Sequence, residues 1–345
     1  MTHTIPRLLG HPVGVRRVID ETPDTKSIVL DIPPELQEKF SYRPGQFLTV
    51  RIPSARTGSV ARCYSLASSP HTDDELKVTV KRTADGYGSN WLCDNIVEGA
   101  QLHVLPPSGT FTPGDLTDDF LLFAAGSGIT PVISILKSVL AQSKSHVALF
   151  YANRDDQSVI FDAELHRLRD TADGRLSVEH WLETDRGLPN ATGLAEFARR
   201  FPGRDAYLCG PAPFMAAVRN MLSDIGMDRS RIHAEEFSSL SGDPFAPAAP
   251  LAATGNASTV VVRLDGESHT LSWPPTANLV DVLLDAGIDA PFSCREGECG
   301  SCMCALTAGT VDLGRIDALD PDDVVDGYIL ACQARPTSPT LEVDF

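Results

Sequence analysis

The sequence predicts three consecutive domains: an antiparallel β-barrel over residues 1–113, an α/β domain with a parallel sheet over 114–238, and a small α+β domain over 258–345. Three observations predict this division. Short β-rich runs separated by Pro and Gly come first, apolar strands alternating with helical stretches follow, and four spaced cysteines lie in the last segment. Residues 239–257, rich in Ser, Pro, Ala and Gly, are expected to form a flexible linker.

The first domain is expected to consist of short strands. Runs rich in β-branched residues are bounded by turn-forming residues, at Ser27–Ile32, Gln46–Ile52 and Leu76–Val80. Short strands with frequent turns are typical of an antiparallel barrel.

The other two domains mix strands and helices. The second is expected to hold parallel strands separated by helical stretches, at Phe120–Ala125, Val147–Tyr151 and Ala206–Cys209. The third is expected to open with two strands and a helix, at Val260–Leu264, His269–Trp273 and Leu279–Ala286.

Charge and hydropathy argue against two classes of function, nucleic-acid binding and membrane insertion. The net charge of −17 argues against nucleic-acid binding, because phosphates would repel the protein. Residues 258–345 hold 15 Asp or Glu against 4 Arg and no Lys, which either steers this domain towards a basic partner or keeps it soluble. The apolar run Leu121–Ala141 is interrupted by Gly126, Gly128, Pro131 and Lys137, so we expect a strand, turn and helix and no membrane span. A cytoplasmic location is expected.

Four cysteines have the spacing of iron–sulfur ligands. Cys294, Cys299 and Cys302 form C-x4-C-x2-C, and Cys332 follows after 29 residues. This arrangement is typical of a plant-type [2Fe–2S] cluster, whereas a structural zinc site favours two C-x2-C pairs. Cys304 lies two residues beyond a ligand and is expected to pack in the core.

Two groups of residues suggest nucleotide binding, although each is weak alone. Arg62 and Tyr64, in Arg62-Cys63-Tyr64-Ser65, share one face of a predicted strand and suit a phosphate beside a flat ring. The run Gly86–Leu92 leads into a helix whose free N–H groups suit a pyrophosphate. In the second domain, Gly126–Pro131 and Cys209–Pro211 follow strands and let a ligand approach the backbone, but the first lacks the full G-x-G-x-x-G pattern.

Together these motifs resemble the ferredoxin–NADP reductase superfamily, and within it the oxygenase reductases with successive flavin, nicotinamide and plant-type ferredoxin domains. The resemblance implies a β-grasp fold for the third domain. Four runs resemble in particular the reductase components of actinobacterial 3-ketosteroid 9α-monooxygenases: Arg62–Leu66, Val80–Tyr87, Tyr151–Asp156 and Pro291–Gly297. The reductase of phenylacetyl-CoA epoxidase is a related alternative.

The resemblance implies roles for individual residues. FAD would be held by three groups: Arg62, Tyr64 and Ser65 at the flavin ring; Lys81, Gly88, Ser89 and Asn90 along the ribityl and pyrophosphate; and Glu235 and Phe237 on the far side of the flavin. The nicotinamide dinucleotide would be bound by Gly126, Thr130, Cys209, Gly210 and Pro211. Arg154 suits a 2′-phosphate while Asp155 and Asp156 repel one, so NADH is expected and NADPH is the alternative. Cys294, Cys299, Cys302 and Cys332 would ligate the cluster.

The implied function is an NADH-dependent flavin and iron–sulfur oxidoreductase, which passes electrons from NADH through FAD and a [2Fe–2S] cluster to a terminal oxygenase. No acid–base residue of the protein is needed for hydride transfer. Two alternatives stay open: an NAD(P)H:quinone reductase that needs no protein partner, and a redox-sensing binding protein that is not an enzyme.

Overall fold

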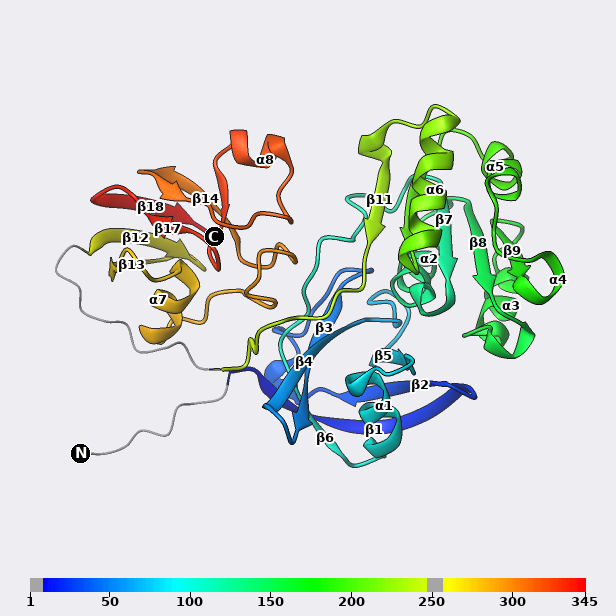
Figure 1. The fold of residues 1–345 in the computed structure, drawn as a ribbon, viewed down its shortest axis with the longest axis horizontal. Helices are drawn as coiled ribbons and strands as arrows, with labels where there is room; N and C mark the ends of the chain where they lie inside the picture. The colour runs from blue at the N-terminus through cyan, green and yellow to red at the C-terminus, as the bar shows by residue number, and fades with distance from the viewer. Residues whose placement is uncertain (1–8, 247–256) are drawn as a thin grey trace.

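The computed structural model describes residues 9–246 and 257–345, which form three domains (Figure 1). The N-terminal barrel lies below the other two in this view, with the C-terminal domain to its upper left and the parallel-sheet domain to its upper right. None of the helices in the described part of the chain is long and apolar enough to cross a membrane.

The first domain is a six-stranded antiparallel sheet in the order β4-β3-β6-β1-β2-β5. An isolated bridge between Leu66 and Val78 joins the end of β4 to β5, so the sheet closes into the predicted barrel. The strands are β1 (His11–Thr22), β2 (Thr25–Asp31), β3 (Phe47–Ser54), β4 (Gly58–Ser65), β5 (Leu76–Lys81) and β6 (Gln101–Val104), with the 3₁₀ turn η1 (Pro34–Leu36) and helix α1 (Tyr87–Asn95). Leu92 of α1 is buried in the barrel core.

The second domain is a five-stranded parallel sheet in the order β11-β10-β7-β8-β9, with helices on both faces. The strands are β7 (Phe120–Ala125), β8 (Val147–Asn153), β9 (Leu176–Leu182), β10 (Asp205–Cys209) and β11 (Ile232–Glu235). The helices are α2 (Ile129–Gln142), α3 (Asp162–Thr171), α4 (Glu183–Arg186), α5 (Ala191–Arg199) and α6 (Ala212–Asp224), with 3₁₀ turns η2 (Gly126–Gly128), η3 (Asp156–Ser158) and η4 (Arg229–Arg231).

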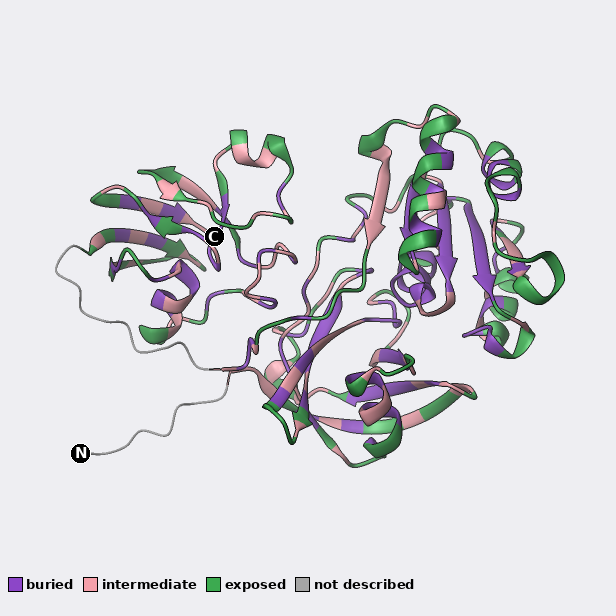
Figure 2. Ribbon diagram, viewed as in Figure 1, coloured by how far each residue is buried: buried purple, intermediate pink, exposed green. Residues whose placement is uncertain are grey.

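Burial explains why the central strands of this sheet are apolar along almost their whole length. Every residue of β7 and β8 is buried (Figure 2), because α2 covers one face of the sheet while α5 and α6 cover the other. Strands that are covered on both faces have continuous apolar sequences, and the apolar runs in this domain were predicted to be such strands.

The third domain is a five-stranded mixed sheet in the order β13-β12-β18-β14-β16, in which β12 and β18 are parallel and the other pairs antiparallel. Its elements are β12 (Ser258–Leu264), β13 (Glu267–Trp273), α7 (Leu279–Asp285), β14 (Met303–Ala308), β15 (Val311–Asp312), α8 (Pro321–Val325), β16 (Tyr328–Leu330), β17 (Arg335–Pro336) and β18 (Thr340–Asp344). Helix α7 packs its apolar face on this sheet, which is the α+β arrangement expected.

The third domain packs directly on the barrel. The hydroxyls of Thr49 and Ser293 lie 2.8 Å apart, and those of Ser108 and Ser301 lie 2.5 Å apart. Lys39 of the barrel also forms an ion pair with Asp289. The cluster loop, residues 294–302, therefore lies against the barrel, and Thr49 contacts its neighbour Ser293 from the face of β3 opposite the barrel core.

The described part of the predicted linker, residues 239–246, is packed and not free. Leu240 and Phe245 are buried in an apolar cluster with barrel residues and with Cys294 and Cys299. Phe245 is 0% exposed. These residues differ from the flexible chain expected, because two apolar side chains find partners that lie far away in the sequence. Residues 247–256 lie outside the described residues.

Candidate functional site

The cluster loop is a tight turn that depends on left-handed backbone. Gly297 and Gly300 have φ of 79° and 72°, and Arg295 has φ of 59°. A Cβ atom on Gly297 would lie 2.3 Å from the carbonyl oxygen of Arg315, and one on Gly300 would lie 2.6 Å from Cγ2 of Thr110. Both glycines are therefore required by conformation and by space.

The four predicted ligands come together around this loop. Cys294 interacts with Cys299 and Cys332, and Cys302 interacts with Cys332. These interactions lower the pKa of Cys294 and raise the pKa of Cys332. All eight cysteines of the chain are free of disulfides.

Backbone N–H groups also point at the sulfurs. The N–H of Glu296 donates to Sγ of Cys294 at 3.3 Å, that of Cys332 to Sγ of Cys302 at 3.4 Å, and that of Cys294 to Sγ of Cys299 at 3.5 Å. Such donors stabilise thiolates, which fits a ligand set for iron. Within the described residues no group of three or more metal-binding side chains is arranged around a single ion. A two-iron cluster divides its thiolates between two irons and does not need that arrangement.

Cys304 is separate from these four sulfurs. It is 2% exposed in the core of the third domain, and burial raises its thiol pKa. Its Sγ lies 3.9 Å from the carbonyl oxygen of Ile329 on the neighbouring strand β16. This position agrees with the prediction that Cys304 packs in the core.

The first predicted nucleotide motif is assembled from β4 and α1. A Cβ atom on Gly88 would lie 2.9 Å from Cγ of Arg62, so only a glycine lets the start of α1 approach the Arg62 side chain this closely. Tyr64 is partly buried beside the barrel core, and burial raises the pKa of its hydroxyl. Ser65, at the end of β4, is buried.

Polar side chains shape the turn that leads into α1. Oγ of Ser89 accepts a hydrogen bond from the N–H of Thr83, and Nδ2 of Asn90 donates to the carbonyl oxygens of Thr83 and Gly86. No side chain caps the N-terminus of this helix. Lys81, at the end of β5, lies 3.7 Å from Asp24. The predicted residues Lys81, Ser89 and Asn90 thus lie on one turn and its neighbouring strand.

The second predicted motif joins two strand ends of the parallel sheet. A Cβ atom on Gly128 would lie 2.1 Å from the carbonyl oxygen of Cys209, so the turn after β7 touches the end of β10. Gly126 has φ of 52°, and Thr130 is buried with its hydroxyl donating to the carbonyl oxygen of Ser127. Gly210 follows Cys209 directly, and Pro211 is the N-cap residue of α6. The structure therefore brings all five predicted nicotinamide residues to one edge of the sheet.

Arg154 lies at the same edge, after β8. Its side chain is exposed and donates from Nε to Asp155 at 3.0 Å. Asp155 also caps η3 through Ser158, so its carboxylate is held in place. The contact with Asp155 raises the pKa of the Arg154 guanidinium, and hydrogen bonds from Ser158 first and Arg154 second lower the pKa of the Asp155 carboxyl group.

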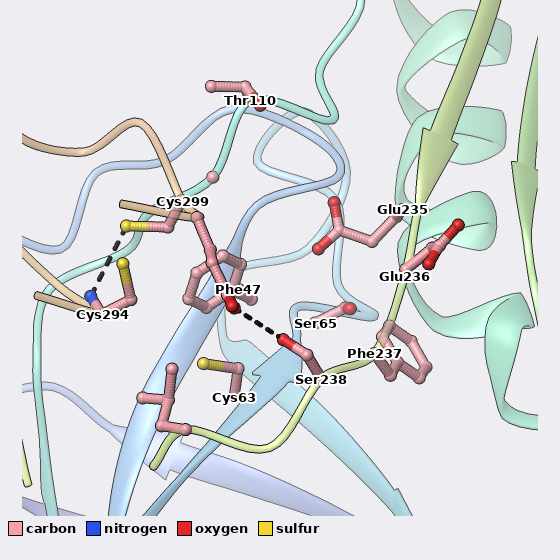
Figure 3. A pocket seen from close by; sticks show the side chains of 13 residues that line it. Phe47, Cys63, Ser65, Thr110, Glu235, Glu236, Phe237, Ser238, Cys294 and Cys299 are labelled. Atoms are coloured by element: carbon pink, nitrogen blue, oxygen red, sulfur yellow. Dashed lines mark hydrogen bonds between the residues drawn. The ribbon is translucent and has the colours of Figure 1, made fainter. Parts of the chain in front are cut away.

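A pocket of about 80 Å³ joins all three domains (Figure 3). Five predicted site residues line it: Ser65, Glu235, Phe237, Cys294 and Cys299. In Figure 3 the two cysteines lie on one side of the pocket and Glu235 on the other. The remaining predicted residues do not line this pocket.

Glu235 is the most perturbed acid of the pocket. It pairs with Cys209 across β11 and β10, and loss of water around its carboxyl group raises its pKa to about 8. The pKa of the Cys209 thiol is also raised, chiefly by burial and then by the charge of Glu235. The carboxyl group of Glu235 and the thiol of Cys209 are therefore both harder to ionise here than they are in water.

Other residues of the pocket were not predicted, among them Phe47, Cys63, Thr110 and Glu298. Cys63 alternates with Arg62 and Tyr64 along β4, so the strand period indicates that it faces the opposite side. Burial raises the pKa of Cys63 to about 12. Nothing local in the sequence indicates that this opposite side meets the cluster loop.

Comparison with known proteins finds three families that match successive parts of the chain. Descriptions of the oxidoreductase FAD-binding domain, the oxidoreductase NAD-binding domain and the 2Fe-2S iron-sulfur cluster binding domain match residues 13–112, 122–220 and 262–337. The chain is 59% identical over 335 residues to the ferredoxin reductase component of 3-ketosteroid-9-alpha-monooxygenase from Rhodococcus rhodochrous, covering 96% of this chain and 95% of the relative. The same component from Mycobacterium tuberculosis is 53% identical over 339 residues, covering 96% and 94%.

This chain belongs to that family of oxygenase reductase components. A solved member of the wider group, phthalate dioxygenase reductase, aligns with 97% of this chain and 98% of its own, at a TM-score of 0.56 and 26% identity. The predictions of the reductase family, of its three-domain fold and of an oxidoreductase with FAD-, NAD- and [2Fe–2S]-binding domains are confirmed.

Proposed function

We propose that this protein takes electrons from NADH and delivers them, through FAD and a [2Fe–2S] cluster, to a terminal oxygenase that hydroxylates a 3-ketosteroid at the 9α position. One observation of the structure supports this proposal independently of the family. Residues expected to contact flavin, Ser65 and Glu235, line the same pocket as the cluster ligands Cys294 and Cys299. Electron carriers bound to these residues would lie next to one another.

The chemistry belongs to the bound groups: FAD accepts a hydride and releases electrons singly, and a [2Fe–2S] cluster carries one electron at a time. The protein holds and orients these groups. Arg62, Tyr64 and Ser65 would hold the flavin ring, while Lys81 and the α1 turn with Gly88, Ser89 and Asn90 would hold the ribityl and phosphate groups. Glu235 and Phe237 would close the other side of the flavin. The side chain of Phe237 is half-exposed there.

The strand ends of the second domain would bind the dinucleotide. Gly126, Thr130, Cys209, Gly210 and Pro211 lie together there, beside β11 and Glu235. Arg154 would lie near the ribose of the coenzyme. Its ion pair with Asp155 places a negative charge next to the guanidinium that a 2′-phosphate would need, which favours NADH over NADPH.

The cluster ligands would be Cys294, Cys299, Cys302 and Cys332. The N–H groups aimed at three of the four sulfurs support this set, and the isolation of Cys304 supports its exclusion. A cytoplasmic location is part of the proposal, since free thiols persist in reducing compartments.

The oxygenase and its steroid come from the relatives, whose printed name is that of a 3-ketosteroid-9-alpha-monooxygenase component. The test combines the purified protein with NADH, a 3-ketosteroid and the oxygenase component from Rhodococcus rhodochrous. We expect 9α-hydroxylated steroid to form in proportion to the NADH consumed. The matched control is Cys332→Ser, which should give none. Rapid NADH-dependent quinone reduction with no steroid product would instead support the partner-independent reductase.

A further inference from the structure

Residues 238–246 form a strap that leaves the second domain after β11 and crosses the barrel (Figure 1). The strap is anchored on the barrel side. Phe245 packs edge-on against His103 with ring centroids 5.7 Å apart, and its carbonyl oxygen accepts a hydrogen bond from Leu9 at 3.1 Å. Asp243 accepts a hydrogen bond from Ser59 at 2.5 Å. The strap therefore has a fixed position relative to the barrel.

The cluster loop is bound to the other side of the strap. Oε1 of Glu296 accepts three hydrogen bonds: from the N–H of Gly242 at 2.6 Å, from Oγ of Ser241 at 2.7 Å and from the N–H of Ser241 at 2.8 Å. Nη1 of Arg295 donates to the carbonyl oxygen of Ala246 at 3.0 Å. Thus two residues between the first two cluster ligands reach back to the strap.

Glu296 accepts three hydrogen bonds from the strap, whereas the ion pair between Lys39 and Asp289 joins the third domain to the barrel at another place. The Thr49–Ser293 and Ser108–Ser301 contacts are single bonds between neutral hydroxyls. Hydrogen bonds to a carboxylate are about twice as strong as neutral ones, and here three converge on one oxygen. Glu298 makes one contact of this kind, accepting from Oγ of Ser238 at 2.9 Å, but it is shared with Arg315.

We propose that Glu296 is a positioning residue: its carboxylate fixes the cluster loop on the strap and so holds Cys294 and Cys299 against the shared pocket. This inference rests on the proposed function, because it concerns how quickly electrons from NADH reach the cluster. The strap begins directly after Phe237, so the same segment joins the wall of the proposed flavin site to the cluster loop. Residues 239–246, which were predicted to be part of a flexible linker, thus hold the cluster loop against the barrel.

The test uses the holoprotein with Glu296→Ala, and Glu267→Ala as the matched control. Glu267 belongs to the same domain and has a side chain that is 79% exposed, and among the described residues its one ion pair is a long contact with His269. Substitution leaves the Glu296 N–H that donates to Cys294, so cluster content should match the wild type. We expect the Ser241 and Gly242 amides to exchange with deuterium roughly tenfold faster in Glu296→Ala, with Phe245 unchanged. Cluster reduction by NADH should slow about tenfold while flavin reduction keeps its rate.

A second variant changes the strap and not the cluster loop, so it leaves the fold around the cysteines unaltered. Ser241→Ala removes one of the three donors and should slow cluster reduction by about twofold to fivefold. In the Glu296→Ala background it should add nothing, because the acceptor is already gone. A full additional effect there would overturn the proposal. So would unchanged exchange at Ser241 and Gly242, or equal acceleration at Phe245, in Glu296→Ala.

These outcomes separate the inference from the proposed function. If NADH does not reduce the cluster of the wild-type protein, the proposed function fails, and the deuterium exchange of the strap still reports whether Glu296 holds it. If NADH reduces the cluster equally fast in the wild type and in Glu296→Ala, the proposed function stands and the role of Glu296 is overturned.

Discussion

Gly128 tests whether the turn after β7 must pack against the end of β10, where the nicotinamide dinucleotide is proposed to bind. A methyl group on Gly128 would lie 2.1 Å from the carbonyl oxygen and 2.4 Å from the carbonyl carbon of Cys209, and neither backbone atom can move aside as a side chain would. Overpacking in a core typically costs about 1–3 kcal/mol and sometimes more. Because the clash is with backbone at the centre of the parallel sheet, we expect Gly128→Ala to cost about 3 kcal/mol or more.

Gly126 provides the matched control two residues away. It has φ of 52°, and nothing lies within 4 Å of the place where its Cβ would be. Gly126→Ala should therefore cost only the strain of left-handed backbone, about 1–2 kcal/mol. The two substitutions are chemically identical, so the difference between them isolates the close approach of Gly128 to Cys209.

The assay is hydrogen exchange measured peptide by peptide in increasing urea, because a single melting temperature is poorly defined for three domains. We expect the free energy of opening of β7 and β10 to fall by about 3 kcal/mol in Gly128→Ala, with the barrel and the third domain unchanged. The KM for NADH should rise in the same variant, with the visible absorbance of flavin and cluster retained. An equal or larger loss of stability in Gly126→Ala would refute the reasoning.

The remaining predictions concern the cluster, Glu235 and the coenzyme. Cys332→Ser should lose cluster absorbance and keep bound flavin and ferricyanide reduction, whereas Cys304→Ser should keep the cluster; the reverse pattern would show the ligand assignment to be wrong. Burial raises the pKa of Glu235 from 4.5 to about 8, so the folded state binds this proton more tightly than the unfolded state does. The stability that the protonated Glu235 contributes is therefore complete below about pH 4.5 and is lost as the pH rises to about 8. Urea unfolding at about pH 5 and about pH 8 should therefore show a stability loss in the wild type, on the order of a few kcal/mol, that is absent in Glu235→Gln; equal losses would contradict the burial of this carboxyl group. Steady-state kinetics should give a higher kcat/KM for NADH than for NADPH, and Asp156→Asn should narrow the ratio by removing a repelling charge; a wild-type preference for NADPH would contradict the assignment of the Arg154 turn.

Local patterns predicted the elements whose residues carry their own signal. Strand β7 was expected at Phe120–Ala125 and lies there, because six buried apolar residues end at a glycine turn. The cluster ligands were predicted from spacing, since three of them belong to one short loop whose glycines fix its path.

Long-range contacts explain what the sequence did not reveal. Residues 239–246 have the composition of a linker, yet Leu240 and Phe245 are buried and Glu296, more than fifty residues away, binds the backbone between them. The shared pocket could not be predicted either. Cys63 and Phe47 belong to barrel strands with an ordinary alternating pattern, and only the docking of the third domain brings them to Cys294 and Cys299.

The central claim is that electrons from NADH reach the iron–sulfur cluster within this one chain. The most direct test is an anaerobic titration of the purified protein with NADH, followed by visible absorbance and low-temperature EPR. We predict bleaching of the flavin together with the rhombic EPR signal of a reduced [2Fe–2S] cluster. Bleaching of the flavin without that signal would contradict the claim and leave a flavin reductase whose third domain has another role.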